Sequence, residues 1–270
     1  MIRLVSFDMD GTFLNSQNDY DRERFQVLLP KLLEKGIRVV ANSGNQYQQI
    51  QSFFKGFEED VVIVSEVGAQ IYEKGQRIYS RHFDRDIVEE MVELFAKKDL
   101  LSRCSVSGLE SLYFEEGADA AFKTLIKKHN HAWTEIPTLQ DLPDDDFTIL
   151  TLDVPHLDIP TLVAEINDLG RGQVQAVSSG FHFIDIVLPG VNKGTALAFL
   201  GERWGIAAEE MLAFGDSDND LEMLEYAGVS YAMQGSPDSV LIAAKHIAPS
   251  NDDSCVLQIL EELVKNETTP

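Results

Sequence analysis

The sequence predicts an α/β fold, in which a Rossmann-like, doubly wound parallel sheet carries an inserted α+β domain. Near both ends of the chain, short apolar runs lead into acidic or glycine-containing turns and then into amphipathic segments, as in strand–helix alternation. Between about Phe83 and Leu188 this alternation gives way to longer helices between paired strands. We therefore expect a core of residues 1–83 and 188–270 and an inserted domain of residues 84–187.

The first strand of the core is predicted at residues 2–7, and two acids follow it. This apolar run is too continuous for a half-exposed strand, which indicates a strand buried on both faces. Asp8 and Asp10 come directly after it, and Gly11 then breaks the pattern. Ligands of open α/β sheets bind beyond the carboxyl ends of strands, so these acids are placed to hold a cation or to attack an electrophile. A turn rich in Asp and Gly, without function, is the alternative interpretation.

The other core elements are predicted from the same alternation. Apolar residues recur every three or four positions from Tyr20 to Lys35, which indicates an amphipathic helix that Gly36 ends and in which Pro30 is the weak point. Further strands are expected at 37–41, 61–65, 211–214 and 229–232, and a hairpin at 71–79. Helices are expected at 46–54, 196–200, 221–226 and 256–264, and the chain end at 266–270 should fray. One more helix should begin at Ser236, with Ser236 as its cap and Pro237 as its first residue.

The inserted domain is predicted to contain helices on an antiparallel sheet. We expect helices at 87–95, 118–128 and 160–169, with Asp158 as a cap, strands at 101–106, 111–114, 147–154, 173–177 and 181–187, and a hairpin turn at 177–180. No catalytic signature lies in this part of the chain. The acidic run 144–146 is interpreted as a solvated loop. His129 and His131 are two positions apart, which is the wrong spacing for a zinc site on one helix face.

Composition limits the possible partners. The chain has 270 residues, is 44% hydrophobic and 25% charged, and carries a formal net charge of −23. It should therefore repel nucleic acid and anionic membrane surfaces, and no basic patch interrupts the acidic background. An anionic substrate would need a metal ion and a well-placed cation. Cys104 and Cys255 are far apart, and Met1 leads directly into the first strand, so we expect reduced, packed thiols in a cytoplasmic protein without a membrane span.

The segment from Asp8 to Thr12 resembles the first motif of the haloacid dehalogenase superfamily. The order of the later motifs is similar to that of its Cof-type phosphatases, which implies a C2-type cap domain inserted into the core. The resemblance implies that Asp8 is the nucleophile and Asp10 the general acid/base. A carboxylate that attacks phosphorus forms an aspartyl phosphate, which divides one difficult displacement into two easier ones. The second acid protonates the leaving alkoxide and then activates water.

Three later segments match the remaining motifs of that superfamily. Ser43 follows the second strand and would hydrogen-bond the phosphoryl oxygens, although it also fits a helix N-cap for residues 46–54. Lys193 stands at the start of a predicted helix, where the macrodipole disfavours a cation, so it is either exposed at a slight cost or held there to meet an anion. The family's third-motif lysine has this setting, so we expect Lys193 to bind phosphate and offset the negative charge of the transferring phosphoryl group. The segment 215–220 ends another strand in acids and resembles the fourth motif.

Converging carboxylates predict a magnesium site, because like charges repel one another unless a dication lies between them. Mg²⁺ prefers oxygen ligands and retains several waters. We expect Asp8 and Asp216 as side-chain ligands, Asp10 as a ligand through its backbone carbonyl, and Asp220 behind them. Phosphate would face the side chain of Asn219 and the backbone amides of Met9 and Gly44.

The chain departs from the family pattern in two turns. Cof-type proteins often carry arginine where this sequence has Asn45, so a charge pairing with substrate is lost there. In the turn after the third strand, Gly68 and Ala69 fit the family's asparagine-rich N-G-A pattern, whereas Glu66 and Val67 do not.

The predicted function is Mg²⁺-dependent hydrolysis of small phosphomonoesters, such as sugar phosphates, nucleotides or phosphorylated cofactors. A phosphomutase or phosphotransferase with the same site and a non-catalytic protein that binds phosphorylated metabolites are the alternatives. Neither the substrate nor the oligomeric state is predicted.

Overall fold

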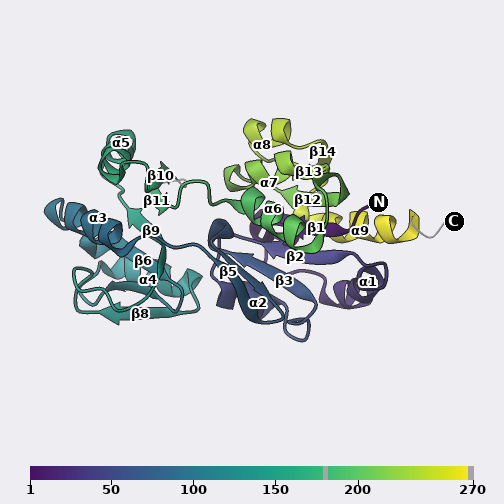
Figure 1. Cartoon of the computed structure of the whole chain (residues 1–270), viewed down its shortest axis with the longest axis horizontal. Coiled ribbons are helices and arrows are strands. Elements are labelled where there is room, and N and C mark those ends of the chain that lie inside the picture. Colours follow the sequence, from purple (N-terminus) through teal and green to yellow (C-terminus); the bar gives the residue numbers. More distant parts are fainter. Residues whose placement is uncertain (179–181, 267–270) are drawn as a thin grey trace. The chain divides into compact units, whose positions relative to one another are not determined.

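The chain divides into two compact units, as the computed structural model of residues 1–178 and 182–266 shows (Figure 1). The first, here called the core unit, comprises Met1–Tyr79 and Asn192–Pro270. The second, here called the inserted unit, comprises Ser80–Val191. That they are a catalytic core and a C2-type cap stays a prediction.

The core unit is built on a mixed sheet that is mostly parallel. Its described strands have the order β14-β13-β12-β1-β2-β3-β4-β5. All neighbours from β14 to β3 pair parallel, and β4 pairs antiparallel with β3. The strands are β1 (Leu4–Phe7), β2 (Arg38–Asn42), β3 (Val61–Ser65), β4 (Gln70–Glu73), β5 (Gln76–Ser80), β12 (Met211–Gly215), β13 (Val229–Met233) and β14 (His246–Ala248). The predicted doubly wound parallel sheet is confirmed; β14, a short edge strand, was not predicted.

Strand register brings the predicted motifs to one edge of this sheet. Phe7, the last residue of β1, lies opposite Ala41 of β2 and Phe214 of β12. Because all three strands are parallel, the residues that follow them emerge side by side at the carboxyl edge. Asp8 therefore lies between the segment that begins at Ser43 and the segment that begins at Asp216.

Helices cover both faces of the core sheet, because alternate residues of each strand point to opposite faces. Val5 of β1 packs in the same cluster as Phe25 of α1 and Leu260 of α9. The neighbouring Leu4 packs instead with Leu197 of α6. The core helices are α1 (Arg22–Glu34), α2 (Tyr47–Phe53), α6 (Lys193–Trp204), α7 (Leu221–Tyr226), α8 (Asp238–Ala243) and α9 (Cys255–Asn266).

Helix α1 tolerates Pro30 in its interior and ends before Gly36, as predicted. Helix α8 begins differently from the prediction. Pro237 occupies the cap position and the helix starts at Asp238, whereas the buried hydroxyl of Ser236 has no hydrogen-bond partner among the described residues. The expectation that Ser236 caps this helix is therefore wrong.

The inserted unit contains a second sheet, whose described strands have the order β10-β11-β9-β6-β7-β8. Its pairs are antiparallel except β7 with β8. The strands are β6 (Cys104–Gly108), β7 (Leu112–Glu115), β8 (Trp133–Ile136), β9 (Phe147–Asp153), β10 (Gln175–Ser178) and β11 (Phe183–Val187), and the helices are α3 (Arg85–Lys97), α4 (Ala120–His129) and α5 (Ile159–Gly170). The predicted α+β class is confirmed, although β8 was missed and Leu101–Arg103 forms a 3-10 turn instead of a strand.

Asp145 shows that the acidic run 144–146 is more than a solvated loop. Its carboxylate accepts hydrogen bonds from the backbone N–H groups of Leu109 and Glu110 and from the hydroxyl of Tyr113. It thereby holds the connection between β6 and β7 in place. The predicted hairpin turn at 177–180 includes residues 179 and 180, which lie outside the described residues, as do residues 267–270 of the predicted frayed end.

Both cysteines, Cys104 and Cys255, are buried free thiols, which confirms the prediction of packed, unpaired residues. Over residues 1–178 and 182–266, none of the helices combines the length and the apolar character that a membrane crossing requires.

Candidate active site

A buried ion-pair network lies at the carboxyl edge of the core sheet and is centred on Lys193. The Nζ atom of Lys193, the first residue of α6, donates hydrogen bonds to Asp8 Oδ1 and to Asp220 Oδ1, each at 2.6 Å. Lys193 and Asp220 are fully buried, and Asp8 is 5% exposed. Two acids from different strand ends and a lysine distant in sequence from Asp8 therefore meet away from water.

Burial and charge shift the pKa values of this network. Burial by itself would lower the pKa of Lys193, but the carboxylates of Asp220 and Asp8 raise it above its ordinary value. The lysine therefore stays protonated. Burial raises the pKa of Asp8 well above its ordinary value; Lys193 opposes the rise, and the charges of Asp220 and Asp216 add to it. Among the described residues around Asp8, the carboxylates of Asp8, Asp216 and Asp220 therefore outnumber the single cation, Lys193.

Asp216 completes a group of acids with the spacing of a metal site. One carboxylate oxygen from each of Asp8, Asp216 and Asp220 lies within 4.8 Å of the others. Burial raises the pKa of Asp216, while the Thr12 hydroxyl opposes this shift by donating a hydrogen bond to its Oδ1 at 2.8 Å. Gly11 allows the close approach, because its φ is +79° and a Cβ there would lie 2.5 Å from Asp216 Oδ2.

The carboxylate of Asp220 is occupied by protein partners. Its Oδ1 accepts from Lys193, and its Oδ2 accepts from the backbone N–H groups of Asp216 and Ser217 at 2.9 and 3.1 Å. These bonds hold the turn that presents the Asp216 side chain. These hydrogen bonds are consistent with the prediction that Asp220 lies behind the metal ligands and is not one of them.

The Asp10 side chain is not part of the group of three acids. It is exposed, and its Oδ2 accepts a hydrogen bond of 2.5 Å from the side-chain amide of Asn45. From the sequence, Asn45 was interpreted only as the loss of an arginine that pairs with substrate in related proteins. In the structure it holds the carboxylate that the resemblance assigns to acid/base chemistry.

The loop after β2 carries the other predicted phosphate contacts. Ser43 is 2% exposed, and its hydroxyl accepts the backbone N–H of Asn45 at 3.1 Å. Helix α2 begins only at Tyr47, after Gln46 at the cap position, so the N-cap interpretation of Ser43 is wrong. A Cβ on Gly44 would lie 3.6 Å from Asn219 Nδ2, which places these two predicted residues side by side.

The other predicted backbone contact, at Met9, follows Asp8 directly. The Met9 side chain is fully buried in the core cluster that contains Phe7. The assignment of its backbone amide to phosphate stays a prediction.

Two residues with structural roles in this site were missed by the sequence analysis. Asn42, the last residue of β2, donates from Nδ2 to the backbone carbonyl of Lys193 at 3.1 Å, which ties the start of α6 to the sheet. Thr12 fixes Asp216, as described above. Only their positions in the motifs, Asn42 next to Ser43 and Thr12 two residues after Asp10, would have indicated them.

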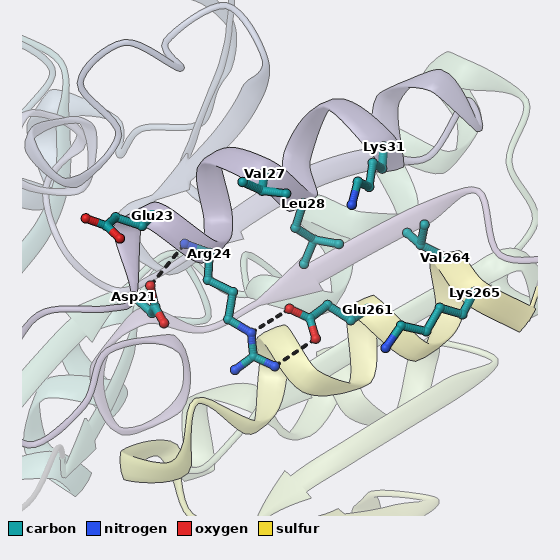
Figure 2. A pocket seen from close by; sticks show the side chains of 9 residues that line it. All are labelled: Asp21, Glu23, Arg24, Val27, Leu28, Lys31, Glu261, Val264 and Lys265. Carbon is teal, nitrogen blue, oxygen red and sulfur yellow. Dashed lines mark hydrogen bonds and ion pairs between the residues drawn. The ribbon is translucent and has the colours of Figure 1, made fainter.

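A separate pocket of about 430 Å³ lies between α1 and α9 (Figure 2). It contains none of the predicted site residues. Within it, Arg24 donates to both carboxylate oxygens of Glu261, at 2.5 and 2.8 Å, and so links the two helices. Its other lining residues are Asp21, Glu23, Val27, Leu28, Lys31, Val264 and Lys265.

Comparison with known proteins identifies the family. The profile of the haloacid dehalogenase-like hydrolases matches residues 5–260. The Escherichia coli 5-amino-6-(5-phospho-D-ribitylamino)uracil phosphatase YbjI is 34% identical and covers 98% of this chain and 97% of that protein. The Bacillus subtilis phosphatase YitU, whose name specifies the same substrate, is 25% identical, with 96% of each chain covered.

Solved structures agree. SMU.1108c from Streptococcus mutans superposes with a TM-score of 0.90 at 32% identity and covers 98% of this chain and 100% of its own. TM0651 from Thermotoga maritima superposes with a TM-score of 0.85 at 26% identity, with 97% of each chain covered. The resemblance carried by the sequence motifs is thus confirmed over nearly the whole chain. The protein belongs to the haloacid dehalogenase-like hydrolase family, and within it the chain is a phosphoric monoester hydrolase.

Proposed function

We propose that this hydrolase is a Mg²⁺-dependent phosphatase of small phosphomonoesters that acts through an aspartyl phosphate on Asp8. The observation that supports this most strongly is the position of the Asp8 carboxylate. It is paired with Lys193 at 2.6 Å and grouped within 4.8 Å with carboxylate oxygens of Asp216 and Asp220. In this proposal the inserted unit is the C2-type cap, and the enzyme works in the cytoplasm.

The donor set fits magnesium. The clustered ligand atoms are all carboxylate oxygens, which a hard cation prefers, and they are short of positive charge. Asp8 and Asp216 would hold the ion with the backbone carbonyl of Asp10, and Asp220 would keep Asp216 in place. When bound, Mg²⁺ neutralises charge on the phosphoryl oxygens and on the nucleophile.

The first half-reaction uses Asp8 and Asp10. A carboxylate oxygen of Asp8 attacks phosphorus while the bond between phosphorus and the ester oxygen breaks. The Asp10 carboxyl group gives its proton to the leaving alkoxide. The hydrogen bond from Lys193 fixes one oxygen of Asp8 and so orients the carboxylate for attack.

In the second half-reaction water attacks the phosphorus of the aspartyl phosphate. Asp10, now ionised, takes the proton of that water, and phosphate leaves as the Asp8 carboxylate is restored. Ser43, Asn219 and the backbone amides of Met9 and Gly44 would hold the phosphoryl oxygens in both steps.

The relatives suggest the first substrate to test. The names of YbjI and YitU specify 5-amino-6-(5-phospho-D-ribitylamino)uracil, and that of a Citrobacter koseri relative, 24% identical over 92% of this chain, specifies HMP-PP. We propose a phosphorylated heterocyclic metabolite of this kind, with the ribityl phosphate ester as the first candidate.

The test measures phosphate release from this compound and from a panel of sugar phosphates, nucleotides and phosphorylated cofactors. We expect turnover with Mg²⁺ and none with EDTA or in Asp8→Asn. Asp60→Asn, a change at an exposed acid, is the matched control and should keep full activity. Turnover by Asp8→Asn would refute the assigned nucleophile. Preferential transfer of phosphate to an added sugar, instead of to water, would identify a phosphotransferase.

A further inference from the structure

The turn after β3 has a strained backbone. Glu66, Val67 and Gly68 have consecutive positive φ values of 53°, 54° and 102°. Glycine adopts this region freely, but a β-branched residue such as Val67 is a genuine outlier there. Such strain persists only where the surroundings fix the backbone, and it concentrates at functional sites.

The surroundings fix this turn from two sides. The backbone N–H of Glu66 donates to the Asn45 carbonyl at 3.1 Å, and that of Val67 donates to the Ser43 carbonyl at 3.2 Å. On the other side, a Cβ on Gly68 would lie 2.4 Å from the backbone oxygen of Asn192, the residue before Lys193. The turn is therefore held between the Ser43 loop and the start of α6.

The Val67 side chain borders the expected phosphate contacts. It is only partly buried, and its Cγ2 lies 3.5 Å from the position of a Cβ on Gly44. The same Cβ position lies 3.6 Å from Asn219 Nδ2, so a methyl group and an amide flank Gly44 together. A methyl group offers phosphoryl oxygens no hydrogen bond, so it is suited to contact the carbon atoms of the alcohol that leaves the ester.

We propose that Val67 is a specificity-determining residue that forms an apolar wall of the leaving-group subsite. It favours esters that present C–H surface next to the phosphoryl group and disfavours those with a charged group there. Asparagine would adopt the same backbone conformation with less strain, and it would place a polar amide at this wall. The inference rests on the proposed phosphatase function. It adds that the substrate is apolar at the carbon atoms nearest the phosphoryl group.

The test compares n-propyl phosphate with phosphoglycolate, which is similar in size but carries a carboxylate. We expect the wild-type enzyme to prefer n-propyl phosphate in kcat/KM. Val67→Thr keeps the side-chain shape and the backbone strain but replaces a methyl group with a hydroxyl. The ratio of kcat/KM for n-propyl phosphate to that for phosphoglycolate should therefore fall about tenfold, through changes in KM. Inhibition by inorganic phosphate, which has no leaving group, should change less than about twofold. Val27→Thr, at an exposed valine of α1, is the control and should leave the preference unchanged.

A second variant tests the strain independently of activity. Val67→Asn should raise Tm by about 2–4 °C, because it relieves the left-handed valine, and should also weaken the preference. An unchanged preference in Val67→Thr, or a phosphate inhibition constant that rises as much as KM, would overturn the proposal. An unchanged or lower Tm in Val67→Asn would overturn the strain argument. A wild-type enzyme that hydrolyses no ester would refute the proposed function itself, which separates that failure from the others.

Discussion

Lys193 donates a hydrogen bond of 2.6 Å to Asp8, and the lysine has no exposed surface. A buried lysine at the first position of a helix is unfavourable on two counts, desolvation and the macrodipole. The two carboxylates that it contacts offset both costs. The ion pair of Lys193 with Asp8 therefore both offsets negative charge in the site and stabilises the core unit.

Lys193→Met tests this double role. The change leaves Asp8 and Asp220 buried without their cation, so we expect a loss of about 3–5 kcal/mol in the free energy of unfolding. The kcat/KM for phosphate esters should fall about 10²- to 10³-fold. Urea titration and steady-state kinetics measure the two effects. Lys31→Met, at an exposed lysine of α1, should change neither, and a stable, active Lys193→Met enzyme would contradict the assignment.

The raised pKa of Asp8 predicts a dependence of stability on pH in the metal-free protein. Because burial raises this pKa above the ordinary value of 3.8, the folded state holds the proton more tightly than the unfolded state. The resulting stabilisation is complete below pH 3.8 and is lost as the pH rises through the raised pKa. In EDTA, Asp8→Asn should therefore gain Tm relative to wild type as the pH rises. A difference that stays constant with pH would show that the pKa of Asp8 is not raised.

Asn45→Ala tests the contact with Asp10. Removal of the amide that donates to Asp10 Oδ2 leaves an exposed carboxylate without a fixed rotamer. We expect kcat to fall about tenfold, because the variant loses only part of the 10²- to 10⁴-fold contribution of a positioned acid/base, while KM changes less than about twofold. Steady-state kinetics on one ester measures both constants. Gln48→Ala, on α2, is the control, and an equal effect of the two variants would argue against a positioning role.

The fold and most of the site could be predicted because their signals are local. The apolar run before Asp8 and the glycine and acids around Asp216 each lie within a dozen residues of sequence. β8 and β14 were missed because they are short, and both carry exposed residues at their sheet edges, such as Trp133 and Ile247. Such strands lack the continuous apolar run that marks a buried strand.

The residues that hold the site together could not be predicted, because their partners are far away in the chain. Thr12 and Asp216 are 204 positions apart, and Asn42 and Lys193 are 151 apart. The N-cap interpretation of Ser43 failed because the helix begins later than the sequence indicated. The Ser43 carbonyl accepts from Val67 in the next turn, and the loop continues to Gln46 before α2 begins.

The link between α1 and α9 gives a prediction away from the active site (Figure 2). Arg24 lowers the pKa of Glu261 below the ordinary value of 4.5 by donating hydrogen bonds to its carboxylate. The stabilisation is therefore present above pH 4.5 and is lost as the pH falls through the lowered pKa. Glu261→Gln should cost about 0.5–1 kcal/mol at pH 7, since the pair is partly exposed, and less in acid. Urea titrations at several pH values measure this, with exposed Glu262→Gln as the control; a cost that persists in acid would mean that packing, and not charge, joins the two helices.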